Sequence, residues 1–426
     1  MKPYYTVSEV ADMLGVTKET LRRWDKSGKL TPARHPINNY RVYLAQNLAQ
    51  FERLGFMFHE PLPVADETPL REYKTIELFA GAGGLALGLE KAGLSNVLLS
   101  EIEPSACKTL RKNRSAWNVK EGDVAQIDFT PYRGKIDVVT GGFPCQAFSY
   151  AGKGFGFEDA RGTLFYQFAR AVKESRPLIC VGENVRGLLQ HDNGKTIQSM
   201  ISVLEELGYD VLPPRLLKAI FHRVPQKRER VFIVGIRRDT GLLFDWPQEN
   251  KELFTVKDAL KKGRLYGSNV PDSPGQAYPK SKREVMAMIP PGGYWRDLPL
   301  EIQKSYMKGS FHLKGGKTGI ARRISWDEPC LTLTCAPAQK QTERCHPEET
   351  RPFTVREYAR IQTFPDEWEF AGSLTAQYTQ IGNAVPVNLA EAMGKAVVRA
   401  LNRYHAAQQL LAEQPDTIAA ERATIA

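Results

Sequence analysis

Residues able to perform covalent chemistry occur in the stretch KIDVVTGGFPCQAFS, residues 135–149. The run from Ile136 to Val139 is apolar and closes on two glycines, a pattern typical of a buried parallel strand that leads into a loop. Cys145 follows, with Pro144 restricting the backbone before it. Ligands and chemistry lie beyond the carboxyl ends of strands in open α/β sheets, so Cys145 is a candidate nucleophile. A free cysteine is more often a buried packing residue, so the interpretation depends on the other strand ends.

Two of those strand ends carry a glycine loop and an acid. A short strand predicted from Thr75 to Phe79 precedes GAGGLA, which begins at Gly81 and fits the pattern G-x-G-x-x-A. The next apolar run ends at Glu101, where a carboxylate can accept hydrogen bonds from a ribose diol. Asp123 lies at a third expected strand end and could bind an adenine amino group. This combination predicts a cofactor with an adenosine group, either NAD or S-adenosylmethionine.

Two further strands add an acid and a polar face. The apolar run from Ile179 leads to Glu183, and QKRER precedes a strand predicted from Val231 to Ile236. In an extended segment Gln226, Arg228 and Arg230 share one face, which suits an anionic or heteroaromatic ligand; the alternative is an exposed edge strand. If one sheet holds all these strands, its carboxyl edge brings together the glycine loop, Glu101, Cys145 and Glu183.

The first residues predict a separate small domain. Thr6 to Glu9 forms a capping box for a helix to Leu14, a turn follows, and Thr17 can cap a second helix. This is a helix-turn-helix pattern that resembles the MerR/excisionase-type DNA-binding module. The basic residues expected on its outer face are Lys18, Arg22 and Arg23. The alternative is a helical packing domain with a solvated basic face.

Composition limits the class of protein. The chain has 426 residues, of which 42% are hydrophobic and 25% charged, as in ordinary globular proteins. Its formal charge of +10 favours a polyanionic partner. No apolar stretch is long enough for a bilayer or a signal peptide, which predicts no membrane partner and a cytoplasmic location. The six cysteines form no CxxC pair, so neither disulfides nor a metal site is expected.

From Thr75 to Leu401 the chain resembles the DNA (cytosine-5) methyltransferase family. The motifs that carry the resemblance are, in order, FAGAGG, SEIE, GDV, GGFPCQAFS, RGTLF, GENV, QKRERVFIVGIR, RPFTVREYARIQTFPD and QIGNAVP. The resemblance implies an α/β fold, with a doubly wound, Rossmann-like methyltransferase sheet and an irregular target recognition domain. The expected organisation is a helix-turn-helix (1–58), a linker (59–74), a first catalytic segment (75–245), a target recognition domain (246–350), a second catalytic segment (351–404) and a tail (405–426).

The family's chemistry then assigns roles to residues. S-adenosylmethionine would methylate carbon 5 of a cytosine flipped out of double-stranded DNA, while Cys145 is bonded to carbon 6. Glu183 would absorb the developing charge, with Arg228 and Arg230 supporting catalysis. The resemblance places these residues around the cofactor: Phe79, Gly81, Gly83, Glu101, Ile102, Asp123, Val124, Pro144, Leu164, Asn383 and Ala384. The DNA contacts expected outside the first domain are Ser149, Arg161, Gln226, Arg322 and Arg323.

Other functions remain open from the sequence. A tRNA cytosine-5 methyltransferase is a rival within the family, whereas an NAD-linked oxidoreductase leaves Cys145 and Glu183 without roles. The first domain could bind the protein's own promoter, and its deletion should then leave methylation intact. Such methyltransferases commonly belong to a restriction-modification system, so a cognate restriction endonuclease is a possible partner on the same DNA site.

Overall fold

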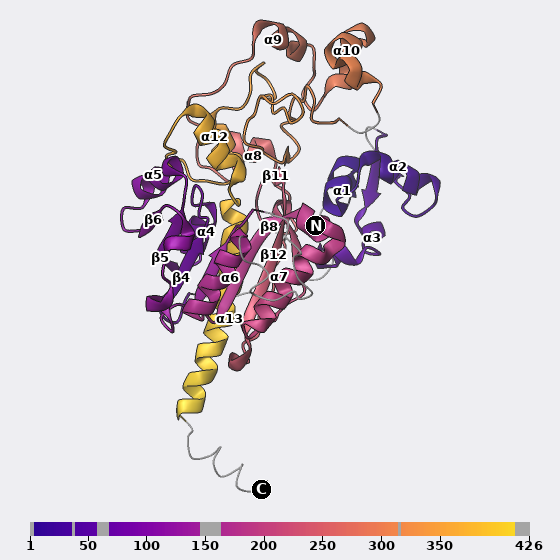
Figure 1. Ribbon diagram of the computed structural model, residues 1–426. Coiled ribbons are helices and arrows are strands. Elements are labelled where there is room, and N and C mark those ends of the chain that lie inside the picture. The colour runs from indigo at the N-terminus through magenta and orange to yellow at the C-terminus, as the bar shows by residue number, and fades with distance from the viewer. Residues whose placement is uncertain (1–3, 36–38, 58–67, 145–162, 314–316, 414–426) are drawn as a thin grey trace.

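The protein is described by a computed structural model, which places residues 4–35, 39–57, 68–144, 163–313 and 317–413 (Figure 1). Its centre is an eight-stranded sheet with the order β10-β12-β8-β7-β4-β5-β6, in which β9 also pairs with β12. The bounds are β4 Tyr73–Leu78, β5 Leu94–Glu101, β6 Val119–Glu121, β7 Val138–Gly141, β8 Ile179–Val185, β9 Tyr209–Val211, β10 Arg215–Lys218 and β12 Glu229–Arg237.

The sheet is mixed, and its helices lie on both faces. Strands β4 to β8 run parallel, whereas β12 is antiparallel to β8. Helices α6 (Leu164–Ser175) and α7 (Lys195–Glu206) pack into one apolar cluster with the sheet, and α4 (Gly84–Lys91) and α13 (Val387–Glu413) into another. Helix α5 (Pro104–Asn113) follows β5. The predicted doubly wound α/β fold is confirmed, with antiparallel strands added at one side.

Helix α13 brings the end of the chain back to the glycine-loop helix α4. Gly88 of α4 allows the close approach, because a Cβ there would lie 2.3 Å from the Cβ of Ala390. Gly394 has the same effect from α13, where a Cβ would lie 2.7 Å from Ala92. Two glycines therefore let α4 and α13, which are far apart in the chain, pack closely against each other.

The predicted strands occur with shifted ends. The strand expected from Thr75 begins at Tyr73, and the strand that begins at Ile179 continues past Glu183 to Val185. Glu183 consequently lies inside β8, opposite Phe232 of β12, rather than after the end of a strand. The antiparallel partner β12 extends β8 past the point where its parallel neighbour β7 ends at Gly141.

The region predicted to be irregular has short elements and a small apolar core of its own. It contains α8 Val256–Leu260, α9 Lys280–Ala287, α10 Leu300–Met307 and β13 Cys330–Leu331, which pairs with β11 Gln226–Lys227. Figure 1 shows α9 and α10 at the top of the molecule, beyond the end of the sheet. Helices α11 (Val355–Ile361) and α12 (Leu374–Asn383) then lead back to α13.

The N-terminal module contains the predicted helix-turn-helix. Helix α1 (Val7–Leu14) has the expected capping box, and Thr17 caps α2 (Lys18–Lys26). Gly15 makes the turn with a φ of +69°. The sequence did not predict the small sheet β1-β3-β2 or the short helix α3; their bounds are Tyr4–Thr6, Arg41–Leu44, Ala33–Arg34 and Ala45–Leu48.

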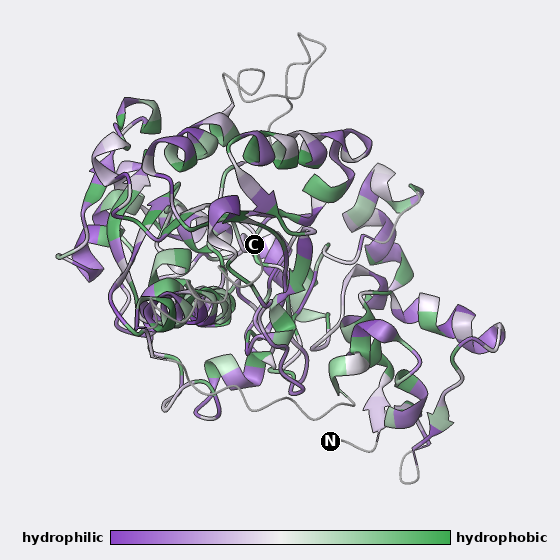
Figure 2. Ribbon diagram, turned by 90° about the horizontal axis from the view of Figure 1, so that it is seen from below, coloured by the Kyte–Doolittle hydropathy of each residue, from purple (hydrophilic) through white to green (hydrophobic). Residues whose placement is uncertain are grey.

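Short 3-10 segments connect these elements. They are η1 Glu52–Met57, η2 Val124–Gln126, η3 Thr130–Tyr132, η5 Arg186–Gly194, η6 Ala219–Phe221, η7 Arg238–Thr240, η8 Trp295–Asp297 and η9 Lys308–Phe311. Figure 2 shows hydrophilic and hydrophobic residues alternating around the helices that cover the sheet, as expected for helices with one buried side. Among the described helices, none combines the length and the apolar character that a bilayer span requires.

Candidate active site

A cavity of about 930 Å³ opens at the carboxyl edge of the parallel strands. Such a volume suits a ligand of cofactor size together with a portion of a second substrate. Its lining combines residues from β4, β5, β8 and β12 and from the segment that follows β7 with residues from the irregular region and from α12. Nine of the predicted site residues line it: Phe79, Gly81, Glu101, Pro144, Glu183, Arg228, Arg230, Asn383 and Ala384.

Glu101 and the glycine loop form one end of this cavity. The Glu101 carboxylate accepts hydrogen bonds from the backbone N–H groups of Gly81, at 2.6 Å, and of Ile102 and Glu103, both at 2.8 Å. A carboxylate has about four acceptor positions, so capacity remains for a ligand hydroxyl. At Gly81 no atom lies within 4 Å of the position a Cβ would take. The loop therefore leaves open space beside a fixed acceptor.

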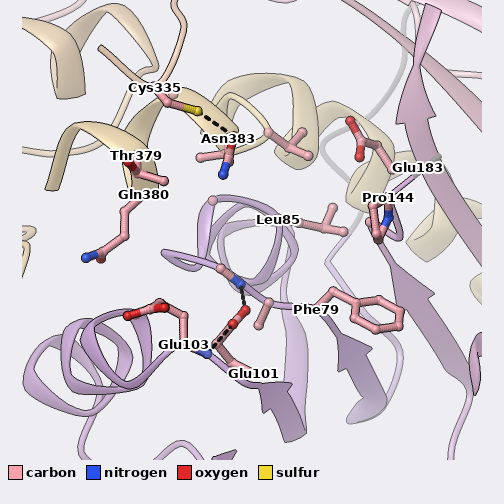
Figure 3. Close-up of a pocket in the computed structure, with 18 of the residues that line it drawn as sticks. Phe79, Leu85, Glu101, Glu103, Pro144, Glu183, Cys335, Thr379, Gln380 and Asn383 are labelled. Atoms are coloured by element: carbon pink, nitrogen blue, oxygen red, sulfur yellow. Dashed lines mark hydrogen bonds between the residues drawn. The ribbon is translucent and has the colours of Figure 1, made fainter. Parts of the chain in front are cut away.

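Glu183 lies at another side of the cavity, next to Pro144 (Figure 3). Its side chain is 8% exposed, and its Oε1 is 2.7 Å from Nε of Arg230. Burial raises the pKa of Glu183, while the charges of Arg230 and Arg228 oppose that rise. Gly142 leaves room for the carboxylate, because a Cβ there would lie 3.1 Å from Oε2. The arrangement holds a carboxyl that can keep or release a proton beside the chain segment that leads to position 145.

Arg228 joins three segments of the chain at the wall of the cavity. Its guanidinium donates to the carbonyl oxygens of Leu333, Gly382 and Asn383 at 3.2, 2.9 and 3.2 Å. The side chain is 1% exposed, and burial lowers its pKa to about 9. Arg228 thus fixes the loop that carries Asn383 and Ala384 relative to β12.

Gln226, Arg228 and Arg230 lie inward rather than on an exposed edge strand. Gln226 is fully buried, donates to Oε1 of Gln362 at 2.8 Å and accepts from the N–H of Leu333 at 2.9 Å. The alternative of an exposed edge strand for this segment is wrong, because Gln226 and Arg228 are buried and Arg230 lies in β12, between β8 and β10.

Glu77 is a cavity residue that the sequence reasoning missed. It lies within β4, is 2% exposed, and its Oε2 has no hydrogen-bond partner among the described residues. Burial, followed by the charges of Glu101 and Glu183, raises its pKa well above the usual range. The available signal was a carboxylate inside an otherwise apolar strand, TIELF. Other lining residues gave no such signal: Leu85, Ser105, Asn184, Thr332, Cys335 and Thr379.

Five predicted cofactor residues do not line the cavity in this structure. Gly83 starts α4 with a φ of +83° and packs against Leu110, and Leu164 is half-buried at the start of α6. Ile102 is 68% exposed just after Glu101. Asp123 is exposed and caps η2, in which Val124 is buried. Cys145, Ser149 and Arg161 lie outside the described residues.

The predicted DNA contacts differ in how exposed their side chains are. Lys18, Arg22 and Arg23 are exposed on α2, as expected. The prediction for Arg323 does not agree with its burial, because it is 3% exposed and donates to the carbonyls of Ile289 and Met286 at 2.7 and 2.8 Å. The buried Gln226 described above disagrees in the same way.

Arg322 occupies an intermediate position. It is partly buried, and its guanidinium lies 5.9 Å from the centre of the Tyr294 ring. The basic loops of the irregular region are therefore held partly by contacts with their own aromatic and carbonyl groups.

Comparison with known proteins agrees with this geometry. Residues 73–399 match the family of C-5 cytosine-specific DNA methylases, and residues 6–43 match the MerR family of regulatory proteins. The chain is 63% identical to type II methyltransferase M.Eco47II of Escherichia coli, over 95% of this chain and 97% of that protein. It is 55% identical to type II methyltransferase M.PspPI of a Psychrobacter strain, over 94% and 97%.

The fold is also similar to that of a solved structure. A putative DNA modification methyltransferase encoded within a prophage of E. coli aligns with a TM-score of 0.61 and 25% identity, over 78% of this chain and all of that one. Sequence, architecture and cavity thus agree over the whole catalytic region. The chain belongs to the C-5 cytosine-specific DNA methylase family and is a DNA (cytosine-5) methyltransferase with a MerR-type helix-turn-helix at its N-terminus.

Proposed function

We propose that this enzyme methylates cytosine through a covalent bond between Cys145 and carbon 6 of the base. The observation that carries the proposal is the buried pair of Glu183 and Arg230 at the end of the cavity beside Pro144. Pro144 directly precedes Cys145 in the sequence, and on that ground we assign the thiol to the end of the cavity where Glu183 lies. A nucleophile paired with an acid of raised pKa is the combination that this reaction requires.

The residues would divide the reaction between them. The Cys145 thiolate attacks carbon 6, breaks the aromaticity of the ring and places electron density on carbon 5. Glu183, in its protonated form, gives or shares a proton at ring nitrogen 3 and so limits the charge that develops there. Arg230 orients the Glu183 carboxyl. Carbon 5 takes the methyl group, its own proton then passes to water or another base, and the electrons of that C–H bond re-form the double bond to carbon 6. The Cys145 sulfur leaves carbon 6 as a thiolate, and ring nitrogen 3 returns its proton to Glu183.

The opposite end of the cavity fits S-adenosylmethionine, which supplies an electrophilic methyl group when bound. Glu101 presents acceptor capacity suited to a ribose diol, and Gly81 leaves space for close approach of a ligand. Phe79, Asn383 and Ala384 complete this end, where Arg228 fixes the backbone of the last two. We assign the outlying Ile102, Asp123, Val124 and Leu164 to the outer wall of the same site.

The substrate we propose is double-stranded DNA in the cytoplasm, with the target base rotated out of the helix to reach Glu183. The two relatives described above are named type II methyltransferases, which supports membership of a restriction-modification system. A cognate restriction endonuclease would then act on the same site without forming a complex with this chain. The family assignment favours DNA over tRNA, and it leaves no support for an NAD-linked oxidoreductase.

Replacement of the nucleophile tests the proposal. Cys145→Ser should lower the rate of methyl transfer to a DNA duplex by on the order of a thousandfold or more, because a serine hydroxyl is a far weaker nucleophile at neutral pH. The measurement is transfer of a labelled methyl group, with cofactor binding followed by calorimetry to show that the site is intact.

Cys335→Ser provides the matched control, because Cys335 is a cysteine that lines the cavity and donates to Oδ1 of Asn383 at 3.1 Å. A serine hydroxyl can make the same hydrogen bond, so this variant should keep most of the rate. A full rate in Cys145→Ser, or a loss confined to Cys335→Ser, would contradict the proposed mechanism.

The MerR-type match supports a second function for the N-terminal module, namely binding to the protein's own promoter. A reporter gene placed under that promoter tests this function. The reporter signal is measured in cells with and without a separate gene for the full chain, and it should fall when the full chain is present. An unchanged reporter signal contradicts it.

A further inference from the structure

The N-terminal module is fixed to the rest of the protein by a network of charges. Nζ of Lys227 lies 2.9 Å from Oδ1 of Asp12 and 3.3 Å from Oε2 of Glu328. The other oxygen of Glu328 accepts from Oγ of Ser8 at 2.7 Å and lies 3.3 Å from Nζ of Lys18. Burial opposes the charge on Glu328, but Lys227, Ser8 and Lys18 lower its pKa to about 2. Three segments far apart in the chain therefore share one set of ion pairs.

Apolar contacts reinforce this attachment. Ile220 and Phe221 of η6 are 2% and 3% exposed and belong to the same apolar cluster as the core of the module. The rings of Phe56 and Phe221 pack with their centres 5.1 Å apart. Nζ of Lys218 donates to the carbonyl of Met13 at 2.8 Å, beside the turn of the helix-turn-helix. The module is thus packed onto the catalytic domain and does not rest on a flexible surface contact.

The attachment places the second helix of the module close to the active site. Lys227 lies between Gln226 and Arg228, and Arg228 and Arg230 line the cavity. Lys18, the first residue of α2, reaches the same Glu328 that Lys227 contacts. Figure 1 shows α1 and α2 on the side of the molecule where β11 lies, next to the irregular region. Helix α2 is therefore linked through Glu328 to the segment that carries Arg228 and Arg230.

The free surface of α2 is basic. Arg22, Arg23 and Lys26 are exposed, as is Lys18 beside its partner Glu328. The two acids of the helix are paired, Glu19 with Arg22 at 3.0 Å and Asp25 with Arg41 at 3.6 Å. A helix with this character suits the phosphates and the major groove of a duplex. An isolated module could use the surface on any DNA. A module held rigidly beside the cavity presents the surface to the DNA that is already bound there.

We propose that α2 contacts the duplex that carries the target cytosine, on the flank next to the target, so that the module and the active site hold one DNA molecule together. The proposal rests on the proposed function, because it takes double-stranded DNA as the substrate. The expected partner is the phosphate backbone of the flanking duplex, contacted by Arg22 and Arg23. The enzyme would then gain affinity from base pairs outside its target sequence.

Duplexes of different length test the proposal with the full-length protein. One duplex ends about half a helical turn from the target cytosine on both sides, and two others extend it by about two turns on one side or the other. For the wild-type enzyme, KM for one of the extended duplexes should be lower than KM for the short duplex. The KM for that extended duplex should also rise more steeply with salt concentration. Each phosphate contact adds about 0.9 to the slope of log affinity against log salt, so two arginines should add about 2.

The variant Arg22→Ala/Arg23→Ala should remove this difference, giving the extended duplex the KM and the salt slope of the short one. The matched control is Arg133→Ala/Arg238→Ala, which removes two exposed arginines at the opposite edge of the sheet and should keep the difference. The measurement is the initial rate of methyl transfer as a function of DNA and salt concentration.

Two results would overturn the inference while leaving the methyltransferase function intact. One is an equal KM and salt slope for short and extended duplexes with the wild-type enzyme. The other is a difference that survives in Arg22→Ala/Arg23→Ala. Absence of methyl transfer to every duplex would instead refute the proposed function itself.

Discussion

Individual residues show how one cavity holds several carboxyl groups in different environments. Glu77, Glu101 and Glu183 line one cavity, but among the described residues only Glu101 accepts hydrogen bonds from backbone N–H groups. Burial raises the pKa of Glu77 and of Glu183, and the arginine beside Glu183 opposes its rise. Three carboxyls of one chemical type thus meet different environments, which suits one to bind a diol and another to exchange a proton.

Glu183→Gln tests the role of the proton at this site. The amide cannot supply it, so the rate of methyl transfer should fall by roughly 10² to 10⁴-fold, with cofactor affinity measured by calorimetry unchanged. Because burial raises the pKa of Glu183, the wild-type carboxyl keeps its proton above the usual range and loses it as pH rises further. The wild-type rate should therefore fall on the alkaline side, and this limb should be absent from the variant. A Glu183→Gln enzyme with wild-type rate and pH profile would show that this carboxyl is a bystander.

Secondary-structure elements place these residues through packing between distant segments. Helix α4 follows the glycine loop, and α13 follows the loop that carries Asn383 and Ala384. The facing glycines Gly88 and Gly394 let the two helices approach closely. The position of one cavity wall therefore depends on contacts made at some distance from it.

Gly88→Ala should destabilise the enzyme by about 1–3 kcal/mol, because the added methyl overlaps Ala390 and the α13 backbone. Denaturant unfolding followed by fluorescence measures this change, and cofactor affinity should fall with it. Gly55→Ala is the matched control, since no atom lies within 4 Å of its added Cβ. That substitution should change stability by about 0.5 kcal/mol or less. Equal stabilities for the two variants would show that α4 and α13 adjust freely.

At the scale of the whole molecule, the helix-turn-helix is an integral component of the fold. The sequence suggested a removable module whose deletion leaves methylation intact. In the structure Ile220 and Phe221 are covered together with the module's core, and Lys227 and Glu328 pair with it. Removal of the module therefore exposes apolar surface on the catalytic domain and deprives buried charges of their partners.

A chain that begins at residue 68 should lose about 2–5 kcal/mol of stability, from exposure of Ile220 and Phe221 and the unpaired charges. Thermal unfolding and light scattering would show a lower melting temperature and aggregation. Replacement of both apolar residues by serine in this shortened chain should reduce the aggregation. A shortened chain as stable and monodisperse as the full one would mean that the attachment contributes little.

The doubly wound order of strands and helices was implied by the resemblance that the ordered motifs carry. The sequence by itself determined the glycine loop, the acid at Glu101 and the helix-turn-helix. These features follow from local backbone requirements and side-chain periodicity, which a short stretch of residues specifies. It did not predict that Glu77 faces the cavity, that Gln226 and Arg323 are buried, or that α1 and α2 are fixed to Lys227 and Glu328. Only the tertiary structure decided these points, because each depends on contacts between segments far apart in the chain. Arg228, for example, binds carbonyls 105 and 154 residues away, and no local pattern encodes such partners.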